Sequence, residues 1–233
     1  MHIGATRKDR IAEMVRTIEA ECALTTRYTG LDFLRPEVLA AMAKVPRDEF
    51  VPADIRSQAF DNCALPIGNG QTISQPFIVA LMTDLLEPEK NDVILEIGTG
   101  SGYQSAVLAE LVHHVYSLEI ITELAAEAAA RLRRLGYDNV DVLATDGYQG
   151  WSAHAPFDGV IVTAAATHVP PPLTEQLRPG GRLVIPIGLP YMHQELMVVE
   201  KDINGQCHTR AVLAVSFVPF TGRGERCGSD LPP

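Results

Sequence analysis

Three alternating glycines directly after an apolar run have the spacing of a site for a nucleotide-derived cofactor. Gly98, Gly100 and Gly102 follow the run Val93–Ile97, which predicts a buried strand. Glycine lets the backbone turn tightly and approach a ligand closely, and the helix expected next offers unpaired N–H groups. A plain strand-to-helix turn does not need three alternating glycines. The pattern therefore favours a cofactor site.

The glycine spacing also separates two classes of cofactor. A dinucleotide site requires G-x-G-x-x-G, in which the third glycine packs helix on strand beneath the pyrophosphate. Here Tyr103 occupies that third position, so the pattern is G-x-G-x-G. This spacing is typical of enzymes that bind S-adenosylmethionine, where no pyrophosphate has to be held. Glu96, two residues before Gly98, also fits this pattern. A nicotinamide-dependent dehydrogenase stays open as an alternative because it shares the fold.

Two further carboxylates follow the next predicted strands. Glu119 comes directly after the strand His114–Leu118, where a carboxylate can accept hydrogen bonds from both ribose hydroxyls. Asp146 and Gly147 follow the strand Val140–Leu143. The Asp146 carboxylate could hold an adenine amino group, or the Asp-Gly pair could simply form a turn. Ligands of α/β folds bind outside the carboxyl ends of the strands, so the three groups together favour a nucleoside site.

The elements that must position these groups alternate between strand and helix. Nearly continuous apolar runs predict strands, and longer amphipathic segments predict helices. The expected strands are Val93–Ile97, His114–Leu118, Val140–Leu143, Gly159–Val162 and Arg182–Ile187, and the expected helices are Pro76–Leu86, a segment ending near Leu111, Glu123–Leu135 and Leu173–Leu177. Such alternation predicts an α/β fold, a doubly wound and mostly parallel Rossmann-like sheet with helices on both faces.

Local signals predict how several of these elements begin, end or turn. Thr122 is expected to be the N-cap of the helix over Glu123–Leu135, and Gly136 its C-terminal stop. Asn204 and Gly205 are a favoured tight-turn pair between the runs Glu195–Val199 and Ala211–Val218. We therefore expect a C-terminal antiparallel hairpin, which is the arrangement that closes the sheet of class I methyltransferases.

The chain divides into three parts by composition. Apolar residues recur at helical spacing from Lys8 to about Ala43, with Pro36 in the first turn of a second helix. Loop residues follow to about Ser74. We expect an N-terminal helical extension with an active-site loop over residues 1–75 and a cofactor-binding core over 76–221. The polar tail, residues 222–233, has the composition of a disordered segment.

Composition excludes several classes of partner and cofactor. The 233-residue chain has a formal net charge of -10, which argues against a nucleic-acid partner because that affinity comes from Lys and Arg. No apolar run approaches the ~20 residues of a membrane span, and no secretory signal is evident. Four scattered cysteines, Cys22, Cys63, Cys207 and Cys227, indicate neither a zinc site nor a redox motif. We expect a cytoplasmic protein without a metal.

The segment Ile67–Pro76 narrows the function. It is a glycine-loosened loop that ends in a hydroxyl-rich turn before a helix. Ser74 has the position of a helix N-cap, with Pro76 in the first turn. Judged from residue types alone, capping by Ser74 is favoured over catalysis, and both are kept.

The same segment resembles the hallmark of one family, the protein-L-isoaspartate O-methyltransferases. That family carries G-x-G-Q-T-I-S-Q-P before an L-E-I-G-T-G-S-G-Y loop, as residues 68–76 and 95–103 do here. The resemblance spans roughly Ile11 to Thr221. Further matches are Val45-Pro46-Arg47, Phe50-Val51-Pro52, His154-Ala155-Pro156-Phe157-Asp158, Val162-Thr163-Ala164-Ala165 and Phe217-Val218-Pro219.

The resemblance implies methyl transfer from S-adenosylmethionine to the free α-carboxylate of isoaspartyl residues in damaged proteins and peptides. This reaction initiates repair through a succinimide. Ser74 would be the active-site hydroxyl, and Phe217–Phe220 would be a strand that pairs with the substrate backbone. The implied cofactor contacts are Gln71, Thr72, Ile73, Ser74, Gly98, Thr99, Gly100, Glu119, Asp146, Gly147 and Thr221.

Two departures from the family pattern concern peptide preference. Asn69 stands where many bacterial members carry histidine, and Ser216 precedes Phe217 where arginine is frequent. We expect a monomer. The alternatives are another class I methyltransferase that acts on a small molecule and a non-catalytic module that binds an adenosyl ligand.

Overall fold

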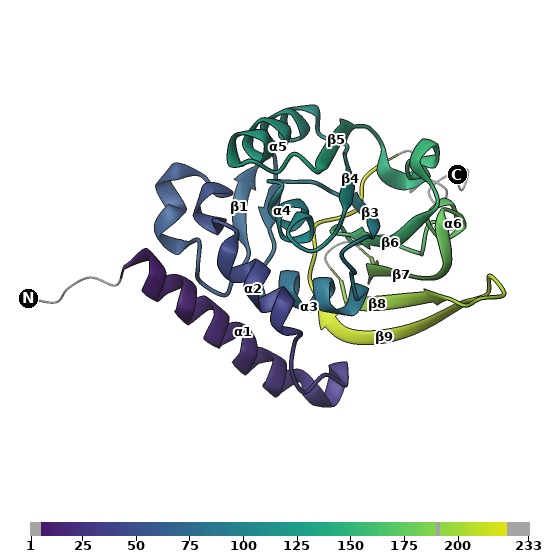
Figure 1. Ribbon diagram of the computed structural model, residues 1–233, viewed down its shortest axis with the longest axis horizontal. Coiled ribbons are helices and arrows are strands. Elements are labelled where there is room, and N and C mark those ends of the chain that lie inside the picture. Colours follow the sequence, from purple (N-terminus) through teal and green to yellow (C-terminus); the bar gives the residue numbers. More distant parts are fainter. Residues whose placement is uncertain (1–5, 190–191, 223–233) are drawn as a thin grey trace, which may run out of the picture.

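The computed structural model describes residues 6–189 and 192–222, and its centre is one large sheet (Figure 1). The strands of this sheet are β3 (Val93–Ile97), β4 (His114–Glu119), β5 (Val140–Ala144), β6 (Phe157–Val162), β7 (Leu177–Gly188), β8 (Gln194–Lys201) and β9 (Cys207–Val215). They lie in the order β5-β4-β3-β6-β7-β8-β9. The first five are parallel, and β8 and β9 add an antiparallel hairpin at one edge. The expected doubly wound sheet is confirmed.

Helices cover both faces of the sheet. They are α1 (Arg7–Thr29), α2 (Pro36–Lys44), α3 (Pro76–Leu86), α4 (Tyr103–Ala109), α5 (Thr122–Leu135) and α6 (Pro171–Glu175). One face is packed by α3, α4 and α5, and the other by α6 with two short 3-10 helices. In Figure 1, α1 runs along the outer side of α2 and α3, so the N-terminal extension adds a further layer. None of the described helices is long and apolar enough to cross a membrane.

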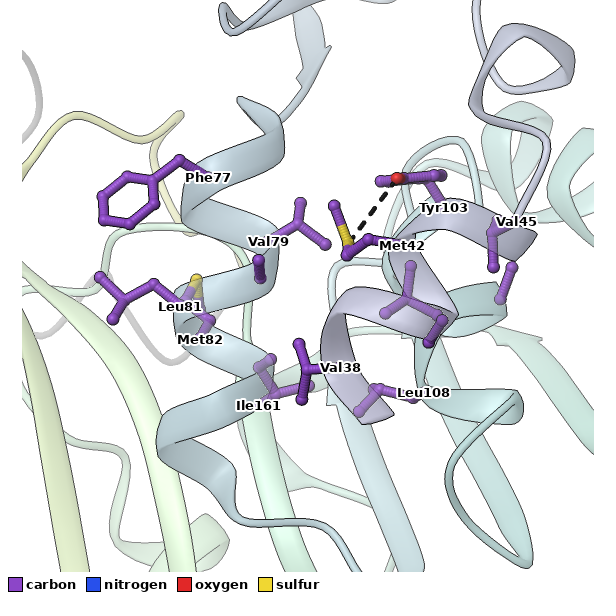
Figure 2. Packing of buried hydrophobic residues seen from close by; sticks show 14 of the residues in the cluster. Val38, Met42, Val45, Phe77, Val79, Leu81, Met82, Tyr103, Leu108 and Ile161 are labelled. Atoms are coloured by element: carbon purple, nitrogen blue, oxygen red, sulfur yellow. Dashed lines mark hydrogen bonds between the residues drawn. The ribbon is translucent and has the colours of Figure 1, made fainter. Parts of the chain in front are cut away.

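The helix α3 is buried almost all round, since it lies between the sheet and the extension. Ten of its 11 residues are buried, from Pro76 to Leu86, so it shows no polar face. Figure 2 shows Val38 and Met42 of α2 facing α3. The Tyr103 hydroxyl of α4 donates to the Met42 sulfur at 3.8 Å. The extension therefore belongs to the same hydrophobic cluster as the core.

A small antiparallel sheet replaces the loop that we expected before residue 74. Its strands are β1 (Leu65–Gly68) and β2 (Gln71–Ile73), paired antiparallel. Asn69 and Gly70 connect them with φ of 52° and 70°. Two successive positive φ values are characteristic of the tight hairpin turn that Asn-Gly favours. The hairpin holds residues 71–73, which are among the predicted cofactor contacts and directly precede Ser74, in one conformation.

The second Asn-Gly pair behaves differently from our expectation. Strand β8 ends at Lys201 and strand β9 begins at Cys207, so the connection between them is longer than a two-residue turn. The Asp202 carboxylate accepts hydrogen bonds from the backbone N–H groups of Asn204 and Gln206, at 2.8 and 2.9 Å. The aspartate side chain therefore organises the loop. The hairpin itself is confirmed.

Two other expected helix boundaries need correction. The helix α5 begins at Thr122, and its N-cap is Ile121 rather than Thr122. Its C-cap is Gly136 with φ of 85°, as expected. The helix α6 ends at Glu175, and Leu177 already belongs to β7. The tail that we expected to be disordered, residues 222–233, lies outside the described residues except for Gly222.

Candidate active site

The loop after β3 lies where the order of the sheet reverses. The neighbours of β3 are β4 on one side and β6 on the other, and the connections leave in opposite directions. A crevice forms at such a switch point, outside the carboxyl ends of the strands. The backbone N–H of Gly98 donates to the Leu118 carbonyl of β4 at 2.8 Å. The glycine loop is therefore seated on the end of the neighbouring strand.

Position 98 requires glycine because its backbone closely approaches Thr163, on the opposite side of the crevice. Its φ is 96°, and a Cβ at this position would lie 2.4 Å from the Thr163 hydroxyl oxygen. That hydroxyl donates to the Gly98 carbonyl at 2.6 Å. Thr163 follows β6 directly, so its side chain ties the loop after β3 to the end of β6. Thr163 lies in a segment that matches the family pattern, but the sequence predicted no role for it.

Glu119 closes the other side of the glycine loop. Its Oε2 accepts a hydrogen bond from the Gly100 N–H at 2.8 Å, and its Oε1 accepts one from the Ile121 N–H at 3.0 Å. The side chain is 6% exposed and lines the cavity beside the loop. Each carboxylate oxygen can accept more than one hydrogen bond. Glu119 therefore keeps acceptor capacity for a pair of ligand hydroxyls.

Asp146 takes part in a turn, which was one of the two roles that the sequence predicted for it. Its Oδ1 accepts a hydrogen bond from the Tyr148 N–H at 3.0 Å and caps the 3-10 helix Gly147–Gln149. Gly147 lines the same cavity as Glu119. A Cβ on Gly147 would lie 2.4 Å from the Ile97 Cγ2, so glycine allows the turn to pack on β3. Asp146 itself flanks the cavity.

Three cavities that share wall residues meet at this end of the described structure. The first is lined by Gln71, Gly98, Gly100, Glu119, Gly147 and Thr221 among others. The second is lined by Ile73, Ser74, Thr99 and Tyr103. The third is a groove of about 550 Å³ lined by Ser74, Gln75, Ile78 and residues 214–218. Thr72 and Thr163 line all three. Every predicted site residue except Asp146 therefore lines one of the three cavities.

Ser74 does not cap the helix that follows it, so that expectation was wrong. The N-cap of α3 is Gln75, without a side-chain hydrogen bond, and the Phe77 N–H donates to the Asn62 Oδ1 at 3.1 Å. Asn62 thus supplies the cap from 15 residues upstream. The Ser74 hydroxyl has no hydrogen-bond partner within the part of the chain that the structure describes. It stands, uncommitted, between the second cavity and the groove.

The segment Phe217–Phe220 is extended but is not the regular strand that the resemblance implied. Strand β9 ends at Val215. The Ala165 N–H donates to the Val218 carbonyl and the Phe220 N–H to the Ala165 carbonyl, both at 2.8 Å. Pro219 has no N–H, which limits regular pairing. The segment is nevertheless fixed, and Val218 lines both the first cavity and the groove.

A buried carboxyl group lies beneath the glycine loop. Glu96 is 0% exposed and accepts hydrogen bonds from the hydroxyls of Ser105 and Ser117, the latter at 2.6 Å. Ser117 in turn lies 2.6 Å from the Thr99 hydroxyl of the loop. Loss of hydration raises the pKa of Glu96 to about 7, with a smaller contribution from the charge of Glu119.

The walls of the three cavities are almost free of formal charge. Glu119 is the one acidic residue that lines them, and no lysine or arginine from the described ranges does so. The described residues also contain no group of three or more His, Cys, Asp or Glu side chains that could hold a metal ion. The arrangement is suited to hold a ligand by hydrogen bonds, with Glu119 as an acceptor.

The sheet, its terminal hairpin and the glycine loop at the switch point define a Rossmann-like methyltransferase. The sequence profile of "Protein-L-isoaspartate(D-aspartate) O-methyltransferase (PCMT)" matches residues 23–225. The chain belongs to this family, as the resemblance of its motifs predicted.

Individual relatives agree with this assignment. The chain is 59% identical to protein-L-isoaspartate O-methyltransferase 2 of Syntrophobacter fumaroxidans, over 91% of this chain and 85% of that protein. A solved protein-L-isoaspartate O-methyltransferase superposes with a TM-score of 0.80 at 26% identity, over 91% of this chain and 66% of that one. The putative Plasmodium falciparum enzyme, solved in complex with S-adenosyl-L-homocysteine, shares the fold with a TM-score of 0.74 at 22% identity, over 93% and 99% of the two chains.

The buried Glu96 predicts a pH-dependent stability. Its folded pKa, about 7, lies above the ordinary value of 4.5, so stability is fully present below pH 4.5 and is lost as pH rises towards 7. Glutamine cannot ionise. Glu96→Gln should therefore gain stability relative to wild type across this interval, by up to roughly 3 kcal/mol at about 1.4 kcal/mol per pH unit. Urea unfolding at about pH 5 and about pH 8 measures this difference.

Exposed Glu37 on α2 offers a control, because Glu37→Gln changes the formal charge equally. That variant should show no such pH-dependent gain. A constant stability difference between Glu96→Gln and wild type at all pH values would contradict the assignment of a raised pKa to Glu96.

Proposed function

We propose that the chain transfers the methyl group of S-adenosylmethionine to the free α-carboxylate of L-isoaspartyl residues in damaged proteins and peptides. The product ester then allows repair through a succinimide. The observation that carries the proposal is the position of the Ser74 hydroxyl. It lies at the junction between the cavity that contains the glycine loop and an uncharged groove, and none of the residues in the described ranges is hydrogen-bonded to it.

The residues that line the first cavity offer the polar groups that S-adenosylmethionine would need. Glu119 would accept the ribose hydroxyls, and Gly98, Thr99 and Gly100 would hold the amino-acid end with their backbone. The turn at Asp146 and Gly147 would border the adenine. Gln71, Thr72, Ile73 and Thr221 would close the cavity from the side of the acceptor. When bound, the cofactor supplies an electrophilic methyl group on a sulfonium. The related Plasmodium falciparum protein was solved in complex with S-adenosyl-L-homocysteine, which is the form that S-adenosylmethionine takes once its methyl group has left.

The acceptor needs no general base. A free α-carboxylate has a reference pKa of about 3.3–3.7, so it is ionised at neutral pH and is already a nucleophile. The enzyme must orient it and remove its water. The Ser74 hydroxyl can donate a hydrogen bond to one carboxylate oxygen and leave the other free to react. The groove presents no cation that would neutralise the carboxylate.

The proposal extends to the organisation of the chain. Residues 1–75 would provide the acceptor loop, and residues 76–221 would bind the cofactor. Both parts contribute to one hydrophobic cluster, which supports their action as a unit. We further propose that the protein acts as a monomer in the cytoplasm. Its substrates would be proteins and peptides rather than nucleic acid, because the net charge is -10.

Methyl transfer to a matched pair of peptides tests the reaction. An isoaspartyl peptide should accept radiolabelled methyl from S-adenosylmethionine, and the label should be released by mild base because it is an ester. The same peptide with normal aspartate should be a far poorer acceptor. Equal labelling of the two peptides, or a base-stable label, would support another methyltransferase. Binding of the cofactor without any transfer would indicate a non-catalytic module.

Glu119→Gln tests the ribose contact. The structure makes glutamine preferable to alanine, because Glu119 also accepts bonds from the Gly100 and Ile121 N–H groups. The amide keeps the shape, but its oxygen is uncharged and its NH2 group cannot accept a hydrogen bond. A hydrogen bond to a charged group exceeds a neutral one by about 1 kcal/mol, so affinity for S-adenosylhomocysteine should fall roughly fivefold or more. Calorimetry checks this. An unchanged Kd in the folded variant would remove Glu119 from the cofactor site.

Ser74→Ala tests the acceptor contact. The single-turnover rate with an isoaspartyl peptide should fall on the order of a hundredfold, because a positioning hydrogen bond is lost. The melting temperature should hardly change, because Asn62 supplies the helix cap. Affinity for S-adenosylhomocysteine should stay within about threefold. A rate close to wild type would show that the Ser74 hydroxyl does not orient the acceptor.

A further inference from the structure

Arg47 is a buried cation with no carboxylate beside it. It lies in the 3-10 helix Arg47–Glu49 and is 0% exposed. Arginine stays protonated in proteins, and buried charges are ordinarily paired with an opposite charge. Within the described residues, no carboxylate forms an ion pair with Arg47, and its Nη1 atom has no hydrogen-bond partner. Burying an unpaired charge is costly, which directs attention to what the guanidinium contacts.

The guanidinium contacts both sides of the proposed site. Its Nε donates to the Ala59 carbonyl and its Nη2 to the Ser74 carbonyl, both at 2.7 Å. Its central carbon lies 4.6 Å from the centroid of the Tyr103 ring. Tyr103 is the first residue of α4, directly after the glycine loop. One rigid side chain therefore connects the acceptor segment with the helix that follows the glycine loop.

The two residues it connects face the same cavity. Ser74 and Tyr103 line the second cavity together with Thr99 and Gly100. The width of this cavity sets the distance between the Ser74 hydroxyl, which would orient the acceptor, and the glycine loop, which would hold the cofactor. Methyl transfer depends strongly on such distances. A planar guanidinium can donate in two directions and stack on a ring at once, which a lysine ammonium cannot do.

We propose that Arg47 is a positioning residue for methyl transfer. It holds the Ser74 segment at a fixed distance from the glycine loop, through its hydrogen bond to the Ser74 carbonyl and its cation–π contact with the Tyr103 ring. The inference rests on the proposed function. If wild type fails to label isoaspartyl peptides, the proposed function falls and this inference falls with it. If wild type is active, the variants below test Arg47 alone.

Arg47→Lys is the first test, because it keeps the charge and should still fold. Single-turnover methyl transfer to an isoaspartyl peptide should slow about tenfold or more, since the two-way hydrogen bonding and stacking cannot be kept together. The Kd of S-adenosylhomocysteine should stay within about threefold, because Glu119 and the glycine backbone are unchanged. A wild-type rate in Arg47→Lys overturns the proposal.

A double variant shows whether Arg47 acts through Ser74. Residues that act as one unit give non-additive losses. In the Ser74→Ala background, Arg47→Lys should change the rate by less than about threefold, because the hydroxyl to be positioned is already gone. An undiminished loss in both backgrounds overturns the proposal, since it would show that Arg47 affects the rate independently of Ser74.

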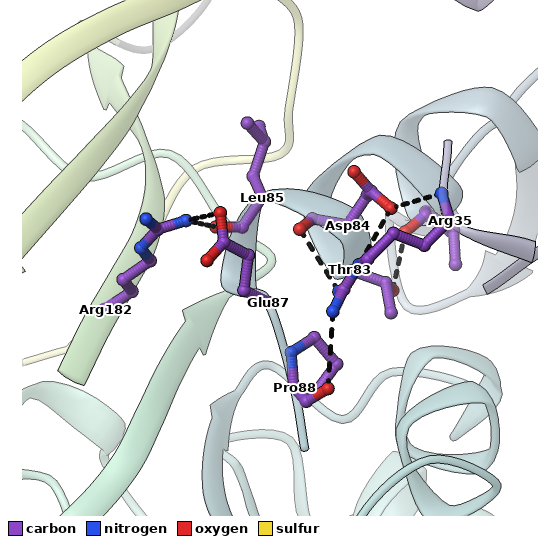
Figure 3. Close-up of polar contacts among 8 residues, drawn as sticks. Arg35, Thr83, Asp84, Leu85, Glu87, Pro88 and Arg182 are labelled. Atoms are coloured by element: carbon purple, nitrogen blue, oxygen red, sulfur yellow. Dashed lines mark hydrogen bonds and ion pairs between the residues drawn. The ribbon is translucent and has the colours of Figure 1, made fainter. Parts of the chain in front are cut away.

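Arg35 provides a matched control at the opposite end of α3 (Figure 3). Its backbone N–H and its Nε donate to the Asp84 Oδ1 at 2.8 and 3.2 Å, and it anchors the start of α2 to α3. Arg35→Met should lower the melting temperature and leave kcat and the peptide KM unchanged. If Arg47→Lys behaves in the same way, Arg47 has only a structural role and the proposal is overturned.

Discussion

The close approach of the glycine loop to the ends of β4 and β6 is the contact on which the rest of the site depends. Gly98 bonds to Leu118 on one side and to the Thr163 hydroxyl on the other. Any side chain at position 98 would collide with that hydroxyl. The strands can therefore present their carboxyl ends to one crevice only because a residue without a Cβ joins them, and the positions of Glu119 and Gly147 follow from this junction.

Two buried ionisable side chains that lack an oppositely charged partner among the described residues lie near the same junction. Glu96 is a fully buried carboxyl with one unpartnered oxygen, and Arg47 is a fully buried cation without a carboxylate. Both contact elements that border the cavities, Glu96 through Ser117 and Arg47 through Ser74. Natural proteins place their locally unfavourable groups at functional sites and stabilise them elsewhere. Here the apolar packing of α3 between sheet and extension provides that stability.

Sequence patterns within one short segment predicted the central strands and helices well. The features that were not predicted depend on contacts between segments far apart in the sequence. The bounds of α3 and β3 match expectation because continuous apolar runs with clear ends determine them. The hairpin of β1 and β2 was missed although Asn69-Gly70 signals a tight turn, because its strands are only 4 and 3 residues long. Thr163 and Arg47 lie in segments that match the family pattern, but the sequence predicted no role for either. Their roles depend on Gly98 and Ser74, which the chain brings to them only after folding.

The start of α3 shows why residue types alone could not decide between capping and catalysis for Ser74. Serine before a helix is an ordinary cap. Here Asn62 reaches the Phe77 N–H and Arg47 holds the Ser74 carbonyl, so other residues bind the backbone at the serine and in the first turn that follows it. The backbone of Ser74 is thus fixed, while its hydroxyl remains uncommitted. A reactive-site hydroxyl needs both conditions, because a capping serine would have to break its own hydrogen bond before it could orient a substrate.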